Sequence, residues 1–236
     1  MISRNCIAVA CLIWACTFQL HAETVEIGRA TIEFPEGNWQ ALTINEGKTT
    51  LDAGVRQSLA TDDRAFILVT GDQVRAILYI SSSKGGSAVT TNWTNTCKST
   101  ERNYAASLTS NPNALECERA TGPLKTDLYL KAAMPQVAKE IEERGLKLPN
   151  ITQSTSGTVG NDRGTMLHIN LLTVSSFSGL QGDEIVGLPS AVKPLHAMWA
   201  HRLVIAIKES VYSMNGKMTI PPVAFSNPRV SQSTTP

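Results

Sequence analysis

The chain has 236 residues, of which 42% are hydrophobic, and its 21 basic and 20 acidic side chains give a formal net charge of +1. That apolar content is enough for a buried core, so the composition excludes a chain that is disordered over most of its length. The near-balance of charge excludes the strongly basic surface on which nucleic acids and anionic membranes depend. We therefore expect a globular protein with no nucleic-acid partner.

Residues 1–22 have the layout of a cleavable secretory signal peptide, in which a basic residue precedes an apolar run that ends at the small residue Ala22. The apolar run of about a dozen residues is shorter than the roughly 20 that a membrane-spanning helix needs, and no later segment is long enough. We therefore expect cleavage after Ala22, a periplasmic or secreted location and no transmembrane span in the mature chain. A lipid anchor on Cys16 is an alternative, although Trp14 stands where lipoprotein signals carry a small side chain.

Short segments of alternating apolar and polar residues follow one another between residues 24 and 93, for example around Val25 and Ile27. An alternation with a period of two predicts half-buried strands. Turns are expected at residues 35–37, 45–47, 61–63 and 71–72. Strands joined by such short turns cannot be parallel, so we expect an antiparallel meander.

Two cysteines, Cys97 and Cys117, are predicted to form a disulfide. Cleavage of the signal peptide would remove the other three, Cys6, Cys11 and Cys16. In an oxidising compartment the remaining two thiols of a small domain usually pair, and closing a loop of about 20 residues stabilises a fold by roughly 3 kcal/mol. The intervening segment is polar and offers little to pack. A redox dithiol is the alternative, but the C-x-x-C spacing typical of that chemistry is absent from the sequence.

The period of the apolar residues changes after the second cysteine. Steps of three and four residues between 130 and 144 predict an amphipathic helix, which either begins near Pro135 or is kinked there. A strand is expected at residues 165–174, followed by a second helix at 190–214, although the LVIAI run within it would also suit a buried strand. Residues 227–236 are expected to be a disordered tail.

These patterns together predict an α+β fold with an antiparallel β-meander sheet of five to six strands, packed by two helices and carrying one disulfide-closed loop. No repeat or linker divides the chain. We therefore expect residues 23–226 to form a single domain.

The sequence predicts no catalytic residue, no cofactor site and no metal site. Residues 46–49 are similar to the end of a phosphate-binding loop, but Leu42 stands where that loop requires glycine. His196 and His201 are five residues apart, so they share a face neither on a helix nor on a strand. A metal site would need His168 together with a carboxylate from elsewhere.

Residue types suitable for hydrolysis occur without a motif that joins them. Ser178, His168 and Asp183 include the members of a catalytic triad, but a triad is defined by geometry, and the chain has no G-x-S-x-G elbow. The paired carboxylates at 62–63 and 142–143 are expected at a turn and on a solvated helix face.

The segment 175–189 is the most suggestive candidate for an interaction loop, because large apolar side chains alternate with glycines in it. The residues concerned are Phe177, Leu180, Ile185 and Val186, with Trp199 on the helix that follows. The alternative interpretation is that these side chains fold back onto the core.

No motif in the chain points to a known family. The expected function is that of an exported, non-catalytic interaction or accessory protein of the cell envelope, whose partner is an unknown protein or a small apolar ligand. The alternative is a small-ligand carrier or hydrolase with a pocket between the sheet and the C-terminal helix. A closed concave pocket lined by Trp199 and the 175–189 loop would favour this alternative.

Overall fold

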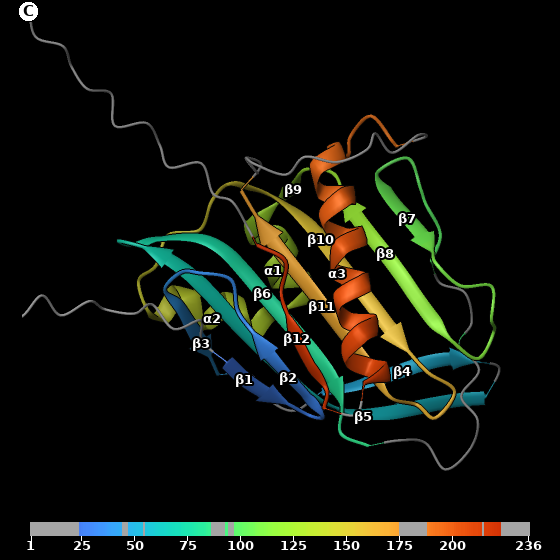
Figure 1. Ribbon diagram of the computed structural model, residues 1–236. Coiled ribbons are helices and arrows are strands. Elements are labelled where there is room, and N and C mark those ends of the chain that lie inside the picture. The colour runs from blue at the N-terminus through green and yellow to red at the C-terminus, as the bar shows by residue number, and fades with distance from the viewer. Residues whose placement is uncertain are drawn as a thin grey trace, which may run out of the picture.

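The computed structural model describes residues 24–43, 47–53, 55–85, 93, 97–174, 188–213 and 215–222, with only the backbone described at 47–53 and 55–59. The predicted signal peptide, the predicted tail and most of the 175–189 loop lie outside these residues. The predicted α+β class is confirmed, with a wider sheet and one more helix than expected (Figure 1).

A large antiparallel sheet forms the middle of the fold, with the strand order β3-β5-β6-β11-β10-β8-β7. These strands are β3 (Trp39–Leu42), β5 (Val55–Thr70), β6 (Gln73–Ser83), β11 (Met166–Thr173), β10 (Ile151–Gly160), β8 (Leu115–Thr121) and β7 (Asn103–Ser107). Two further strands extend it, since β4 (Gly47–Ala53) pairs with β5 and β9 (Leu124–Lys125) pairs with β10. Strands β6 and β11 are neighbours although they are far apart in sequence, so this pairing joins the two halves of the sheet.

The turn expected at residues 61–63 is wrong, because β5 continues through these residues for a total of 16. Asp63 lies opposite Ser81 of β6 and is buried. A polar pair is compatible with a central strand when the neighbouring strand supplies a hydrogen-bond partner, and Ser81 Oγ donates to Asp63 Oδ1 over 2.7 Å.

One face of the main sheet is covered by α3 (Pro194–Tyr212) and by a small mixed sheet (Figure 1). The small sheet consists of β1 (Thr24–Ile27), β2 (Ala30–Glu33) and β12 (Lys217–Thr219), with β12 parallel to β2. Trp199, Leu203 and Ile207 of α3 are fully buried in the core on this face. The predicted second helix is therefore confirmed, and its apolar stripe faces the sheet as its periodicity requires.

The close approach of α3 to the sheet depends on Gly157 of β10. A Cβ atom at this position would lie 2.9 Å from Val204 Cγ2 and 3.0 Å from Ile207 Cδ1. We expect Gly157→Val to lower the free energy of unfolding by about 1–3 kcal/mol, because the helix must shift to accommodate the added side chain. Urea denaturation measures this loss. Gly85→Val is the control, since no atom of the described residues lies within 4 Å of a Cβ there, and an equal effect of both variants would contradict the prediction.

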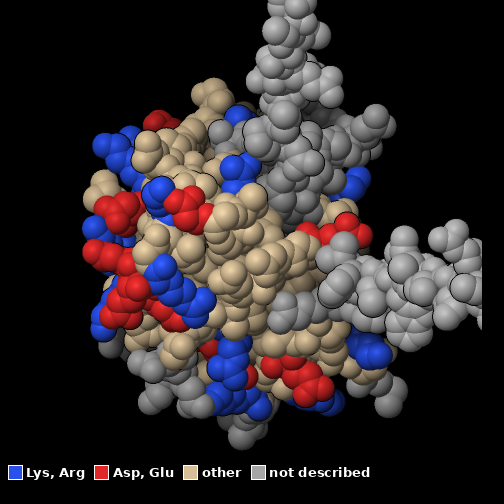
Figure 2. All heavy atoms as spheres, turned by 90° about the vertical axis from the view of Figure 1, so that its left-hand side faces the viewer, with Lys and Arg blue, Asp and Glu red and all other residues tan. Residues whose placement is uncertain are grey.

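The opposite face is covered by α1 (Thr126–Ala133) and α2 (Pro135–Glu143), in place of the one helix expected at 130–144. Pro135 is the first residue of α2, where its missing N–H costs no helical hydrogen bond. Leu130 of α1 and Val137 and Ile141 of α2 pack against the sheet in a second apolar core. The outer surface of α1 and α2 carries interspersed acidic and basic side chains, including the Lys139–Glu143 ion pair. Figure 2 shows both signs of charge mixed on the side of the molecule where these helices lie.

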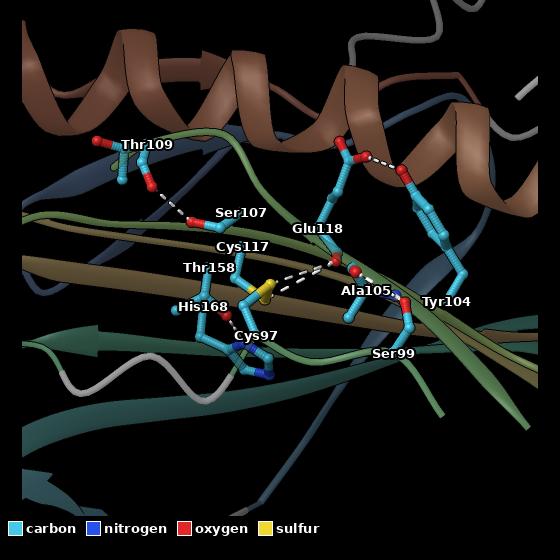
Figure 3. Close-up of a disulfide and its surroundings, with 10 residues drawn as sticks. All are labelled: Cys97, Ser99, Tyr104, Ala105, Ser107, Thr109, Cys117, Glu118, Thr158 and His168. Atoms are coloured by element: carbon cyan, nitrogen blue, oxygen red, sulfur yellow. Dashed lines mark hydrogen bonds between the residues drawn. A yellow bond between two sulfur atoms is a disulfide. The ribbon is translucent and has the colours of Figure 1, made fainter. Parts of the chain in front are cut away.

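The two cysteines lie at disulfide distance, as predicted, with their sulfur atoms 2.07 Å apart and their Cα atoms 5.7 Å apart. The segment between them is not the loosely packed loop that its polarity suggested, because it contains β7 and the beginning of β8 (Figure 3). Glu116 and Glu118 of β8 point toward α3. Lys208 Nζ lies 3.0 Å from Glu116 Oε2, and His201 Nδ1 lies 2.7 Å from Glu118 Oε2. None of the helices among the described residues has both the length and the apolar character that crossing a membrane requires.

Candidate functional site

A row of polar side chains crosses the α1–α2 face of the sheet. Asp63 of β5, Ser81 of β6, His168 of β11 and Thr158 of β10 occupy directly opposite positions on successive strands, and Cys117 of β8 continues the row. Directly opposite residues of neighbouring strands share a face. Thr158 Oγ1 and His168 Nδ1 are hydrogen bonded at 2.7 Å, beside the disulfide (Figure 3). Regular strand pairing therefore gathers residues from five strands into one line.

A second polar pair lies two residues further along the same face, where Tyr79 of β6 is opposite Asn170 of β11. Ser154 Oγ donates to Asn170 Oδ1 over 2.7 Å, and Asn170 Nδ2 donates to the hydroxyl of Tyr129 on α1 over 3.4 Å. The rings of Tyr79 and His168 have centroids 6.4 Å apart. The two rows are thus held in place by bonds to strands and to one helix.

A cleft of about 400 Å³ lies between this polar floor and the junction of α1 with α2. The floor consists of Asp63, Tyr79, His168 and Asn170, and the walls consist of Tyr129, Ala133, Met134, Pro135, Gln136 and Val137. The volume falls within the roughly 300–1,000 Å³ of typical small-molecule sites. The break between the helices at Met134 and Pro135 forms part of the wall, so Pro135, which prevents one continuous helix, also lines the cleft.

Asp63 is nine-tenths buried, with 9% of the residue exposed. The hydroxyls of Ser81 and Tyr79 each donate a hydrogen bond to its carboxylate. Among the described residues, no lysine, arginine or histidine forms an ion pair with Asp63. Its negative charge therefore faces the cleft without a cationic partner from the part of the chain that the structure describes.

The other titratable groups of the floor are uncharged at neutral pH. Burial lowers the pKa of His168 to about 4, and the positive charge of Arg119 acts in the same direction. Burial also raises the pKa of Tyr79, and the negative charge of Asp63 raises it further. Among the described residues that line the cleft, Asp63 is consequently the only formally charged one.

The floor contains serine, histidine and aspartate, but their bonds do not form a catalytic triad. A triad requires the histidine to lie between the nucleophile and the carboxylate. Here Ser81 bonds directly to Asp63, and His168 Nδ1 bonds to Thr158. Within the part of the chain that the structure describes, no group of three or more His, Cys, Asp or Glu side chains is arranged to hold a metal ion.

The candidate residues that the sequence indicated as an interaction loop or as histidine ligands are not brought together in one place. Trp199 is fully buried, and its Nε1 donates to the carbonyl of Pro221 over 3.3 Å. His196 is buried and bonds to Thr155, apart from His201, which contacts Glu118. Phe177, Leu180, Ile185 and Val186 lie outside the described residues, as do Ser178 and Asp183, so what was expected of them stays a prediction.

The cleft residues Asp63, Tyr79, Tyr129 and Asn170 are not among the candidate site residues that the sequence indicates. Asp63 was assigned to a turn, and the surface position expected for the 62–63 pair is wrong for Asp63 because it is buried. The sequence does contain an indication of this burial, since Asp63 is separated by steps of two residues from the buried Ala65 and Ile67. Extending that alternation toward the N-terminus would have placed the carboxylate on a covered face.

Another hollow, of about 250 Å³, lies near the end of α3 and includes Arg29 and Arg163. Both arginines are exposed to solvent. Water screens exposed charges strongly, so this hollow has weaker means of holding a ligand than the cleft with its buried carboxylate.

Comparison with known proteins adds no assignment to the cleft. No protein-family model, no curated protein and no solved structure matches the chain. What the cleft binds must therefore be inferred from the residues that line it.

Proposed function

We propose that this protein is an exported, non-catalytic binding protein that holds a small molecule in the cleft between the main sheet and α1–α2. The observation that carries the proposal is a cleft of about 400 Å³ with polar side chains from β5, β6 and β11 on its floor. Side chains on strands are held in fixed positions, so ligand binding costs little conformational entropy of the protein. Export is supported by the character of residues 1–22 and by a cysteine pair at disulfide distance.

The lining of the cleft favours binding over chemistry. A few polar groups converge on the floor, while Met134 and Val137 provide apolar walls, and this combination is typical of ligand sites. The hydroxyl of Ser81 is bonded to Asp63 and not to a histidine of the kind that activates a nucleophile. His168 Nδ1 is bonded to the hydroxyl of Thr158 instead. The pocket expected between the sheet and the C-terminal helix is not part of this proposal, since Trp199 is fully buried there.

Blocking the cleft tests the proposal. Ala133 lies at the end of α1, is exposed and lines the cleft, whereas its exposed neighbour Ala132 does not line it. We expect Ala133→Trp to abolish binding, because the indole would fill space that the ligand needs, and we expect Ala132→Trp to bind as the unchanged protein does. Three probes with one ring and different charges are used, namely phenethylamine, 2-phenylethanol and phenylacetate. Saturation-transfer difference NMR on the full-length chain detects their binding.

The expected result is that at least one of the three probes binds and that only Ala133→Trp removes this binding. If none of the probes binds, or if both tryptophan variants bind like the unchanged protein, the cleft is not the ligand site and the proposal is wrong. Thermal unfolding of both variants verifies that a loss of binding does not reflect a loss of folding.

A further inference from the structure

We infer that the cleft is selective for a small organic cation, a protonated amine on a compact apolar body, whose ammonium group pairs with Asp63. This inference rests on the proposed function, that the cleft binds a small molecule. It names the chemical class of that ligand from the charge, burial and surroundings of Asp63.

The three most buried acidic residues of the described chain differ in the partners of their carboxylates. Glu116 has Lys208 as its partner, at 3.0 Å, and Glu118 has both His201, at 2.7 Å, and the hydroxyl of Tyr104, at 2.5 Å. Asp63 has the hydroxyls of Ser81 and Tyr79, and no cationic group of the described residues pairs with it. A buried carboxylate without a cation is costly to maintain, so a cationic ligand would supply the kind of partner that Lys208 provides for Glu116.

Neutral and anionic ligands match this floor less well. An anion would meet the Asp63 charge in a partly desolvated cleft, where repulsion between like charges is stronger than in water. A neutral ligand would cover the carboxylate without pairing it. The other described residues of the lining carry no positive charge to offset either disadvantage.

The aromatic residues of the cleft suit an organic cation. Tyr79 on the floor and Tyr129 on the wall both line the cleft, and the faces of tyrosine rings attract alkylammonium groups. Met134 and Val137 are available to the apolar part of the ligand. A bare metal ion fits poorly, because Ca²⁺ takes about 6–8 oxygen ligands and the described residues of the lining supply a single carboxylate.

The test compares the three probes named above on the full-length chain, with dissociation constants from NMR titrations at neutral pH and low salt. Phenethylamine is expected to bind about tenfold more tightly than 2-phenylethanol, because its ammonium forms a charge-assisted hydrogen bond, and phenylacetate is expected to bind most weakly. Asp63→Asn retains an acceptor for Ser81 and should abolish the preference for the amine. Asp62→Asn is the matched control, since Asp62 is the adjacent residue on the other face of β5, where it pairs with Arg64.

The outcomes separate the two proposals. If 2-phenylethanol or phenylacetate binds at least as tightly as phenethylamine, or if Asp63→Asn and Asp62→Asn alter the preference equally, the inference about charge is wrong while the cleft remains a binding site. If none of the three probes binds, the proposed function fails and the inference fails with it. Should Asp63→Asn not fold, the ranking of the probes on the unchanged protein decides, because a preference that weakens in high salt requires a charged partner.

Discussion

Reducing the Cys97–Cys117 disulfide is expected to lower the free energy of unfolding by about 3 kcal/mol, because the bond restricts the unfolded chain by closing a long loop. The two cysteines are 20 residues apart in sequence. The closed loop contains β7, which lies at the end of the sheet and pairs with β8 alone. Urea denaturation of the oxidised and the reduced chain at neutral pH measures the difference.

The double variant Cys97→Ala/Cys117→Ala is the control for this experiment. It should unfold at a similarly low urea concentration, and reductant should not change its midpoint. This comparison also accounts for Cys6, Cys11 and Cys16 of the full-length chain, since any effect of reductant on them persists in the variant. Equal midpoints for the oxidised and the reduced unchanged protein would contradict the prediction.

Acid is expected to destabilise the protein between about pH 6.5 and pH 4 through His196. This histidine is fully buried, and burial, aided by the positive charge of Lys193, lowers its pKa from 6.5 to about 4. In that pH range the unfolded chain binds a proton at His196 that the folded chain does not, so the free energy of unfolding falls as the pH falls. Its full contribution is about 3 kcal/mol, since each pKa unit corresponds to about 1.4 kcal/mol. The lowered pKa of His168 acts in the same direction.

Urea denaturation at a series of pH values tests this prediction with His196→Gln, which retains a polar group that can bond to Thr155. Because carboxylates titrate in part of the same range, the quantity to compare is the difference between the variant and the unchanged protein at each pH. This difference should shrink toward pH 4, since the variant lacks one acid-sensitive group. A difference that stays constant from pH 7 to pH 4 would show that His196 does not contribute.

The elements that the sequence predicted well are those with strong local signals. Helix α3 has apolar residues at helical steps along its whole length, and its core-facing residues such as Trp199 and Ile207 are fully buried. The cysteine pair followed from compartment and spacing. Pro135 indicated where the helix at 130–144 would be interrupted, because a residue without an N–H is tolerated at the first turn of a helix.

Of the strands that the sequence did not predict, β8 and β10 have polar residues among their buried ones. Strand β10 has the sequence ITQSTSGTVG, and most of its hydroxyl-bearing residues are buried among other strands. In β8 the side chains that face α3 include Glu116 and Glu118. The polar positions of an alternating strand usually face solvent, whereas here they are buried. The partners that make this burial possible, Lys208 and His201, are more than 80 residues away in sequence. A pattern confined to one segment does not reveal such distant partners.

The cleft was beyond prediction for a related reason. Its floor unites Asp63 of β5 with His168 of β11, and these strands are brought close by the pairing of β6 with β11. That pairing depends on tertiary contacts across the sheet, because no short turn connects the two strands. Without it, Asp63 and His168 are two polar residues in separate segments.

The small sheet brings together strands from both ends of the described chain, since β12 pairs with β2 and places Met218 opposite Ile32. Ile27, Ile32 and Met218 all belong to the core beneath α3. While the ribosome is still synthesising residues 217–219, β2 lacks its second neighbour and this core lacks part of its cover. Any chain with this topology that crosses a membrane can complete its fold only after both ends have crossed.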